Sequence, residues 1–417
     1  MPAPVDSPPG GAAPANRVAP WVIFSITVTG ILANTLITPA IPDILAEFDQ
    51  PGGRAGILVA AGAVPGIVMA PLIGVLADRH GRRRVLLPAL VTFGVFGAAS
   101  SLAPSFWVLV ALRALQGLGA AGLLNLAITL VSDHWQGLDR ARLLGTNGAV
   151  LTVSIAVFPP VGGLLTELGG WRIAFLPYAF ALVTALVLRR QLPAAEIVDR
   201  PALAEGAAPA GAWADFRVAL RIARAPAVLV PIGMAFVAFV LIFGLFLTAL
   251  PVHLEEVFDL GAGARGLVLG VPAITSTVVA LSLGRLRARF GARRIVLVAW
   301  TMAALGFAAV AGAPAVVLVL VGAGLYGLGE GALIPTLQDL VAGAAPAEGR
   351  AAVIALLVGA IRAGQSIGPL LVGILLSATT TATPFAVGAA LALTVVALAV
   401  SAGRRVLPTV SQPAATA

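Results

Sequence analysis

Long apolar runs separated by short polar breaks make up most of the chain. A run of about 20 residues can cross roughly 30 Å of hydrocarbon as a helix whose backbone hydrogen bonds are all internal. Twelve runs meet this length, and we place them at 21–41, 54–77, 85–104, 106–131, 143–166, 171–189, 226–250, 262–284, 294–312, 315–338, 351–377 and 383–402. The pattern therefore predicts an all-α integral membrane protein with twelve transmembrane helices.

A polar stretch between the sixth and seventh runs divides them into two groups of six. It carries acids, arginines, Pro and Ala with little apolar periodicity, which indicates a linker outside the membrane. The segment before the first run is rich in Pro, Gly and Ala, a composition that cannot bury a core and predicts a disordered cytoplasmic tail. The predicted segments are a tail at 1–20, an N-terminal six-helix half at 21–189, a cytoplasmic linker at 190–225, a C-terminal six-helix half at 226–403 and a cytoplasmic tail at 404–417.

The two halves repeat each other at one constant offset in residue number, without a gap. The aligned pairs, which we call repeat partners, include Gly74 and Gly284, Arg79 and Arg289, Gly81 and Gly291, Gly117 and Gly327, Pro159 and Pro369, and Gly163 and Gly373. Two halves of the same orientation are related by a pseudo-twofold axis along the membrane normal, and transport sites lie at their interface near the bilayer midplane. The repeat therefore indicates transporter architecture.

The composition excludes a water-soluble architecture and most cofactor chemistry. Of the 417 residues, 59% are hydrophobic and 11% are charged, so too little polar surface exists to cover a soluble protein. No cysteine is present and the three histidines lack ligand spacing, so neither a disulfide nor a metal site is expected. The net charge of +8 comes from arginines in the polar breaks, which indicates membrane topology and no nucleic-acid partner.

The positions of the arginines predict the orientation in the membrane. If the N-terminus is cytoplasmic, the outer breaks contain three arginines, Arg54, Arg172 and Arg265, against seven acidic residues. Nearly all other arginines then lie in inner breaks, in agreement with the positive-inside rule. We expect a multi-pass protein of the cell's cytoplasmic (inner) membrane with both termini in the cytoplasm.

One inner break, from Gly74 to Leu87, is rich in arginine and contains one acid, Asp78. It closely resembles the loop between the second and third helices of the major facilitator superfamily, and the resemblance extends over 21–403. The matching residues are Gly74, Leu76, Ala77, Asp78, Arg79, Gly81, Arg82, Arg83 and Leu86. By this resemblance, Asp78 meets the N-terminal end of the eleventh helix near Ala351 and latches an inner gate, with Gly74 packed closely against the other half. The second copy of the loop has Ala288 in place of the acid, so we expect an asymmetric latch.

Two further motifs are similar to those of the twelve-helix drug:proton antiporters of this superfamily. The fourth run matches at Arg113, Gln116, Gly117, Gly119, Ala120 and Ala121, a motif of proton-coupled members. The antiporter motif of the fifth run is half present: Pro159, Gly162 and Gly163 match, and Ser154 and Phe158 replace two glycines. The resemblance implies export by alternating access, with the first, fourth, seventh and tenth helices lining a central cavity.

Three ionisable side chains, Arg113, Glu330 and Arg362, fall inside predicted spans, where ionisable groups are costly and usually functional. Burial disfavours the charged carboxyl group and a nearby arginine favours it, so protonation of Glu330 can depend on whether an arginine or a substrate is close. We therefore predict Glu330 as the proton carrier, with Arg113 and Arg362 beside it and Asp43 at the outer mouth as a reserve. A static bridge from Glu330 to Arg113 or Arg362 is the alternative.

Polar and aromatic side chains in the same spans are candidates for substrate contact. The polar candidates are Asn34, Gln116, Asn125, Tyr326 and Gln365, and the aromatic candidates of the seventh run are Phe236, Phe239, Phe243 and Phe246. The phenylalanines follow helical spacing, so they form a stripe that suits stacking on a flat apolar ligand. Contact with lipid explains the stripe equally well.

The leading hypothesis is a secondary transporter that exports a small apolar or amphiphilic compound, such as a drug, antibiotic or metabolite, in exchange for protons. The alternative within transport is a proton symporter for uptake of a sugar or an organic anion, which Arg113 and Arg362 would bind. A non-transporting receptor or scaffold is the alternative from another class. We expect no enzyme activity, no cofactor other than the proton gradient, a monomer, and partners limited to substrate, protons and the lipid bilayer.

Overall fold

The computed structural model describes residues 18–192, 221–222, 224–346 and 349–401. Every regular element in these ranges is helical. The N-terminal half consists of α1 (Pro20–Thr35), η1 (Thr38–Ala40), α2 (Ile41–Glu47), η2 (Gly52–Arg54), α3 (Ala55–Ala63), α4 (Pro65–His80), α5 (Arg82–Ala99), η3 (Ser100–Leu102), α6 (Phe106–Ala120), α7 (Leu123–His134), α8 (Gly137–Gly169), η4 (Ile173–Ala179) and α9 (Phe180–Gln191).

The C-terminal half consists of α11 (Pro226–Leu241), η5 (Ile242–Ala249), α12 (Leu250–Phe258), α13 (Ala262–Ala311), α14 (Val316–Ala344), α15 (Arg350–Ala378) and α16 (Thr383–Ser401). The predicted tails at 1–20 and 404–417 and the predicted linker at 190–225 lie wholly or largely outside the described residues. Each half has a hydrophobic core of its own.

Within the described ranges, eleven helical segments are long and apolar enough to cross a membrane, one fewer than predicted. The difference arises at α13, a segment of 50 residues that covers both the eighth and the ninth predicted run. At 1.5 Å per residue such a helix would be about 75 Å long, far more than one crossing needs. Gly291 interrupts it with non-helical dihedral angles (φ 73°, ψ 158°), so its two parts run as separate helices.

The backbone confirms the repeat register. The repeat partners Gly81 and Gly291 both have a positive φ, 89° and 73°. Asp49 and Asp259, which are also repeat partners, are the two non-glycine residues with positive φ in the described chain, at 55° and 49°. A positive φ strongly favours Gly and, among other residues, Asn and Asp, so the repeat preserves turns that the chain needs in both halves.

Glycines hold neighbouring helices in close contact at equivalent places in the two halves. A Cβ atom on Gly119 would lie 2.5 Å from the carbonyl oxygen of Ala89, and one on Gly329 would lie 2.5 Å from the carbonyl oxygen of Ala299. The two glycines are repeat partners, and so are the two alanines. Small residues of this kind let backbones approach where no hydrophobic effect drives helices together in lipid.

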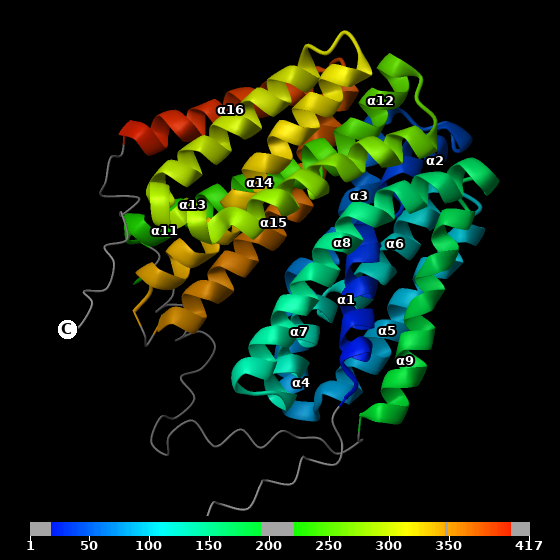
Figure 1. Cartoon of the computed structure of the whole chain (residues 1–417). Helices are drawn as coiled ribbons and strands as arrows, with labels where there is room; N and C mark the ends of the chain where they lie inside the picture. Colours follow the sequence, from blue (N-terminus) through cyan, green and yellow to red (C-terminus); the bar gives the residue numbers. More distant parts are fainter. Residues whose placement is uncertain (1–17, 193–220, 223, 347–348, 402–417) are drawn as a thin grey trace, which may run out of the picture.

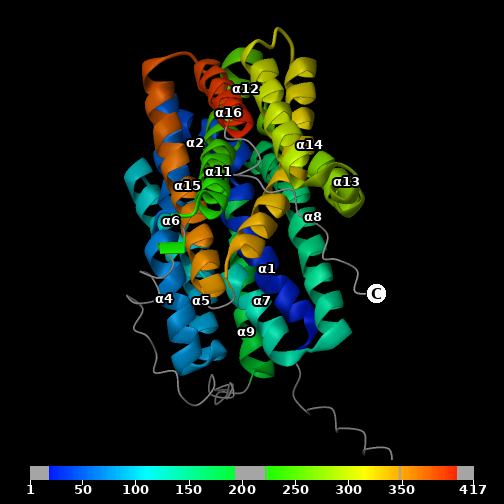
Figure 2. The same cartoon turned by 90° about the vertical axis from the view of Figure 1, so that its left-hand side faces the viewer.

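The two ends of the molecule differ in charge and in how the halves meet. We call one the acidic end, formed by Asp43, Glu47, Glu167, Glu255 and Glu256, and the other the arginine end, formed by Arg79, Arg82, Arg83, Arg84, Arg289, Arg293 and Arg294. Figure 1 shows the halves together around α2 and α12 and diverging toward α4 and α7 in one half and α11 in the other. Figure 2 shows α12 at one end of the molecule and α4, α7 and α9 at the other.

Equivalent glycines bring the halves into contact near the acidic end. A Cβ atom on Gly266 of α13 would lie 2.4 Å from the carbonyl oxygen of Pro159 in α8, and one on Gly56 of α3 would lie 2.2 Å from that of Pro369 in α15. Gly56 and Gly266 are repeat partners, as are Pro159 and Pro369. The structure is therefore closed at the acidic end, while its halves separate toward the arginine end.

Candidate functional site

Glu330 lies in α14, half-buried, on a small cavity of about 10 Å³ in the C-terminal half. The other residues that line this cavity are Ala238, Leu241, Ile242, Trp300, Ala303, Tyr326, Leu333 and Ile334. The carboxyl group of Glu330 makes neither an ion pair nor a hydrogen bond with any described residue. The static bridge to Arg113 or Arg362 is therefore absent from this conformation.

Arg113 of α6 is 1% exposed and is held by neutral groups. Its Nη1 donates to Oε1 of Gln116 at 2.6 Å, and its Nη2 donates to Oδ1 of Asn34 at 3.1 Å. Its Nε has no partner within the described chain. Three residues predicted for the cavity are thus brought together, and a buried positive charge is left without an acidic partner, which is costly in a membrane.

Arg362 of α15 is half-buried and reaches from the C-terminal half to the N-terminal half. Its Nη1 donates to Oε1 of Gln365 at 3.3 Å, and its Nη2 donates to the carbonyl oxygen of Ala121 at 3.5 Å, between α6 and α7. Both bonds are long, so this guanidinium group is weakly tied. No described acidic residue pairs with it.

The two guanidinium groups lie beside successive turns of the second span. A Cβ atom on Gly62 of α3 would lie 2.8 Å from Nη2 of Arg113, and one on Gly66 of α4 would lie 3.9 Å from Nη1 of Arg362. Residues four apart on a helix are about 6 Å apart along its axis. Two positive charges therefore lie near each other, that of Arg113 inside the N-terminal half and that of Arg362 at the interface between the halves.

The phenylalanines of the seventh span divide into two environments. Phe236, Phe239 and Phe243 are half-buried, the rings of Phe239 and Phe243 are 6.4 Å apart, and Phe243 packs against the core of the N-terminal half. Phe246 is buried and its ring lies 4.2 Å from that of Tyr326. Contact with lipid therefore does not account for Phe243, which faces the interface between the halves.

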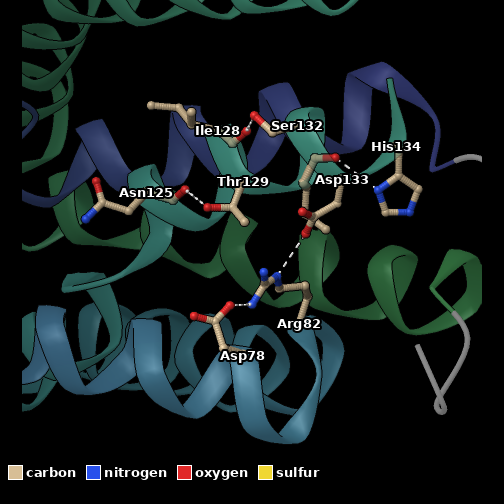
Figure 3. Close-up of polar contacts among 9 residues, drawn as sticks. Asp78, Arg82, Asn125, Ile128, Thr129, Ser132, Asp133 and His134 are labelled. Atoms are coloured by element: carbon tan, nitrogen blue, oxygen red, sulfur yellow. Dashed lines mark hydrogen bonds and ion pairs between the residues drawn. The ribbon is translucent and has the colours of Figure 1, made fainter. Parts of the chain in front are cut away.

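Asn125, the remaining polar candidate, is exposed on α7. Its carbonyl oxygen accepts a hydrogen bond from Thr129 Oγ1 at 2.9 Å, and its side chain points away from the arginine network at the end of the helix (Figure 3). No hydrogen bond among the described residues joins Asn125 to Arg113 or to Glu330.

At the arginine end, one side chain joins three helices of the N-terminal half. Arg82 of α5 donates from Nη1 to Asp78 of α4 at 2.5 Å and from Nε to Asp133 of α7 at 3.0 Å (Figure 3). The side chains of Arg82 and Asp133 are 5% and 7% exposed, whereas that of Asp78 is 52% exposed. The predicted bond from Asp78 to the eleventh helix stays a prediction, since in this conformation Asp78 is bound within its own half.

The other residues of this loop are more open. Arg79 is exposed, and Nη1 of Arg83 donates to the carbonyl oxygen of Leu192 at 2.7 Å. A Cβ atom on Gly74 would have no described atom within 4 Å, so the expected close packing of Gly74 against the other half is not present here. The separation of the halves at the arginine end explains this difference.

At the acidic end, Asp43 of α2 forms an ion pair with Arg265 of α13. Arg265 is 2% exposed and Asp43 is 42% exposed. The pair joins the two halves where they are in contact. Asp43 is therefore placed at a closed contact between the halves at the acidic end, and its reserve role in proton coupling stays a prediction.

Removing the acid of this pair is expected to open the acidic end. Asp43→Asn leaves the buried charge of Arg265 without its partner, and the cost falls only on the closed state. We expect the open population to rise about 5-fold to 30-fold, which corresponds to about 1–2 kcal/mol for a partly exposed pair. Because the chain has no cysteine, spin labels at Leu168→Cys and Val257→Cys report the distance across this end by pulsed electron resonance.

Asp49→Asn is the matched control, because Asp49 is exposed at the same end and forms no ion pair with the described residues. An unchanged distance distribution in Asp43→Asn would show that the ion pair does not hold this end closed.

The motif residues of the fifth span form a packing surface. A Cβ atom on Gly162 would lie 1.7 Å from the carbonyl oxygen of Leu36 in the first span, and one on Gly163 would lie 2.3 Å from that of Ala262 in α13. Pro159 is buried against Gly266, as described above. These residues let α8 contact both its own half and the other half.

Gly162→Ala is expected to destabilise the protein, because the added methyl group has no space. Overpacking costs about 1–3 kcal/mol, which exceeds the gain of about 1 kcal/mol in helix propensity from Gly to Ala. Gly148→Ala in the same helix is the control, since a Cβ atom there meets no described atom within 4 Å. Thermal unfolding in detergent should show a lower Tm for the first variant and an equal or higher Tm for the second.

Three residues of the site were not predicted from the sequence: Asp133, Arg265 and Trp300. Asp133 has one sequence signal, an acid at the end of a span beside an arginine-rich loop. The sequence gives Arg265 only a topological role, and Trp300 carries no pattern that distinguishes it from a packing residue. Their roles depend on helix contacts that a one-dimensional pattern does not contain.

A protein-family model described as Major Facilitator Superfamily matches residues 23–286 and 262–416. The multidrug resistance protein Stp of Mycobacterium tuberculosis (strain CDC 1551 / Oshkosh) is 34% identical over 169 residues, 40% of this chain and 30% of that protein. The tetracycline resistance protein, class H, of Pasteurella multocida is 30% identical over 171 residues, 40% of this chain and 41% of that protein. The chain thus spans less than half the length of these curated relatives.

Solved structures share the fold. A bacterial homologue of the human lysosomal transporter spinster, solved in an inward-facing and unoccupied conformation, has a TM-score of 0.72 and 18% identity, with 93% of this chain and 95% of that chain covered. The nucleoside transporter NupG has a TM-score of 0.73 and 12% identity, with 92% and 98% covered. At these identities the likeness concerns the fold alone.

Proposed function

The chain belongs to the major facilitator superfamily, and from this premise we propose that it exports a small apolar or amphiphilic compound in exchange for protons. Its arginine end faces the cytoplasm, as the positive-inside rule favours, so the conformation described above is open to the cytoplasm. The relatives named for drug resistance support export. The chain is therefore a multi-pass transporter that works by alternating access and not an enzyme.

One observation carries the proton exchange: the carboxyl group of Glu330 lies inside the membrane on a cavity, without a described partner. An acid with no permanent counter-charge can bind and release a proton as the cavity changes its access to water. Arg362 carries positive charge at the interface, Arg113 carries it inside the N-terminal half, and both respond to the charge of the substrate. Asp43 takes part in closing the outer side.

Transport by the purified protein in liposomes with an acidic lumen tests the exchange. Permanently charged quaternary ammonium dyes and uncharged dyes are suitable substrates, because neither is trapped by acid alone. Accumulation in the acidic lumen, beyond that of protein-free liposomes, supports exchange for protons. Accumulation in an alkaline lumen would show symport and overturn the proposed direction, and no accumulation of any dye under either gradient would favour a receptor or scaffold.

A second candidate function, proton symport of an organic anion, is favoured by the two arginines. Arg113 and Arg362 lie beside successive turns of one span, and no described acid pairs with either. An anionic group between the halves would supply the missing counter-charge. An aromatic sulfonate that accumulates in an alkaline lumen, and that no longer does so in Arg362→Gln, would support this function over export.

A further inference from the structure

Trp300 and Glu330 are brought to neighbouring levels by the tight contact between α13 and α14. Gly329, the residue before Glu330, contacts the carbonyl oxygen of Ala299, the residue before Trp300, so closely that a Cβ atom would lie 2.5 Å from it. Both side chains line the same cavity. The contact therefore places Glu330 and Trp300 at about the same height along their two helices.

Three residues that line this cavity each carry a polar group that has no hydrogen bond to any described residue. These groups are the carboxyl group of Glu330, the hydroxyl group of Tyr326 and Nε1 of Trp300, which is fully buried. Trp300 itself is 1% exposed. Buried polar groups in folded proteins nearly always have a partner, in the protein or in ordered water, so three unpaired groups on residues around one small cavity call for a partner that the described residues do not supply.

The ring of Tyr326 packs against two phenylalanine rings that also contact each other. Its centroid lies 4.2 Å from that of Phe246 and 5.1 Å from that of Phe307. Phe307 is two helical turns after Trp300, so both face α14 from the same side of the helix. The hydroxyl group and the indole N–H therefore have fixed positions, and neither can turn away to find another partner.

The size of the cavity fits about one water molecule. The centre of a water molecule needs roughly 10–15 Å³ of free space and the molecule needs two to four polar partners, and the cavity has about 10 Å³ of such space beside three residues that can supply them. We propose that it holds one ordered water molecule that links Glu330 to Trp300 and Tyr326, which makes these two residues positioning residues for the proton carrier. Water that accepts from the indole N–H and the hydroxyl group donates to the carboxylate, and so stabilises its ionised form.

No other described charge competes for Glu330 in this cavity. The residues from α11 are apolar, and α13 contributes only Ala303 besides Trp300. From α15, Arg362 faces the interface, where it is bonded to Gln365 and Ala121. Hydrogen-bond donors, and not a counter-ion, therefore determine the balance between the two forms of Glu330. The inference rests on the proposed role of Glu330 in proton exchange.

Infrared difference spectroscopy of the detergent-purified protein during a pH titration tests the proposal without transport. The carboxyl band that disappears in Glu330→Gln belongs to Glu330. At the pH where half of Glu330 is ionised in the wild type, Tyr326→Phe and Trp300→Phe should each lower the ionised fraction of Glu330 at least about twofold. The reason is that a hydrogen-bond donor on the path to the carboxylate is lost. The band of the ordered water, identified by its shift in H₂¹⁸O, should also weaken in both variants.

Tyr178→Phe is the matched control, because Tyr178 is the only other tyrosine of the chain and lies in the N-terminal half. Tyr326→Phe keeps the ring and its packing, so it decides the outcome if Trp300→Phe does not fold. An unchanged Glu330 band in Tyr326→Phe, or an equal change in Tyr178→Phe, would overturn the proposal. If the band responds as expected but Glu330→Gln still transports with the proton gradient, the water site stands and the proposed function fails.

Discussion

Glu330→Gln is expected to abolish proton-driven accumulation of substrate and to leave exchange of substrate without a pH gradient largely intact. Glutamine has nearly the shape of glutamic acid but neither gains nor loses a proton at neutral pH. The apolar walls of the cavity remain, so substrate binding and the rocking of the two halves continue. We expect accumulation under the gradient to fall at least about tenfold, toward the rate of protein-free liposomes.

The measurement compares two assays on one preparation: dye uptake driven by an acidic lumen, and exchange of labelled for unlabelled dye at equal pH. Asp339→Asn is the matched control, because Asp339 lies further along the same helix, is 58% exposed and pairs with Arg287 at the arginine end. Gradient-driven uptake that survives in Glu330→Gln would remove this residue from proton exchange. Loss of both assays would indicate a structural role.

The fold could be predicted because its determinants repeat along the chain. Apolar runs of membrane-spanning length and arginines in the breaks are properties of single segments, and the offset between the halves reappears as paired positive φ values at Gly81 and Gly291. The eighth and ninth runs join into α13 because the break at Gly291 is a single residue. Such a break interrupts the dihedral angles without ending the helical segment.

The candidate site could be predicted only in part. The arginines and the acid inside the spans stand out because charge is rare there, so Arg113, Glu330 and Arg362 are visible without a structure. The partners on other helices are not visible, because those depend on which helix faces which. Gln116 lies three residues after Arg113 on the same helix, so its spacing allows the contact. The contact of Arg113 with Asn34 needs two helices to meet, and nothing in either sequence segment indicates it.

Asp78→Asn is expected to reduce transport severely at normal expression. In the conformation open at the arginine end, Asp78 accepts a charge-assisted hydrogen bond from Arg82, which also binds Asp133. By resemblance to the superfamily, the same carboxylate meets the eleventh helix when this end closes. In the open conformation Arg82 keeps Asp133 as a partner, so the loss falls mainly on the closed conformation. A hydrogen bond to a charged group contributes about 1.5–3 kcal/mol, and its loss in one conformation changes the ratio of the two about 10-fold to 150-fold. A transporter that must visit both conformations in every cycle slows accordingly.

Ala288→Asp separates a gating role of Asp78 from a general effect of charge at this end. Ala288 is exposed at the repeat position of Asp78, and arginines surround it as they surround Asp78. Its neighbour Arg287 already pairs with Asp339, so a new carboxylate at 288 does not reproduce the bridge of Arg82 to two acids. We therefore expect no gain in transport from Ala288→Asp and no rescue of Asp78→Asn in the double variant. Restoration of transport in the double variant would show that the acid acts through local charge alone and that the latch is not specific to the first half.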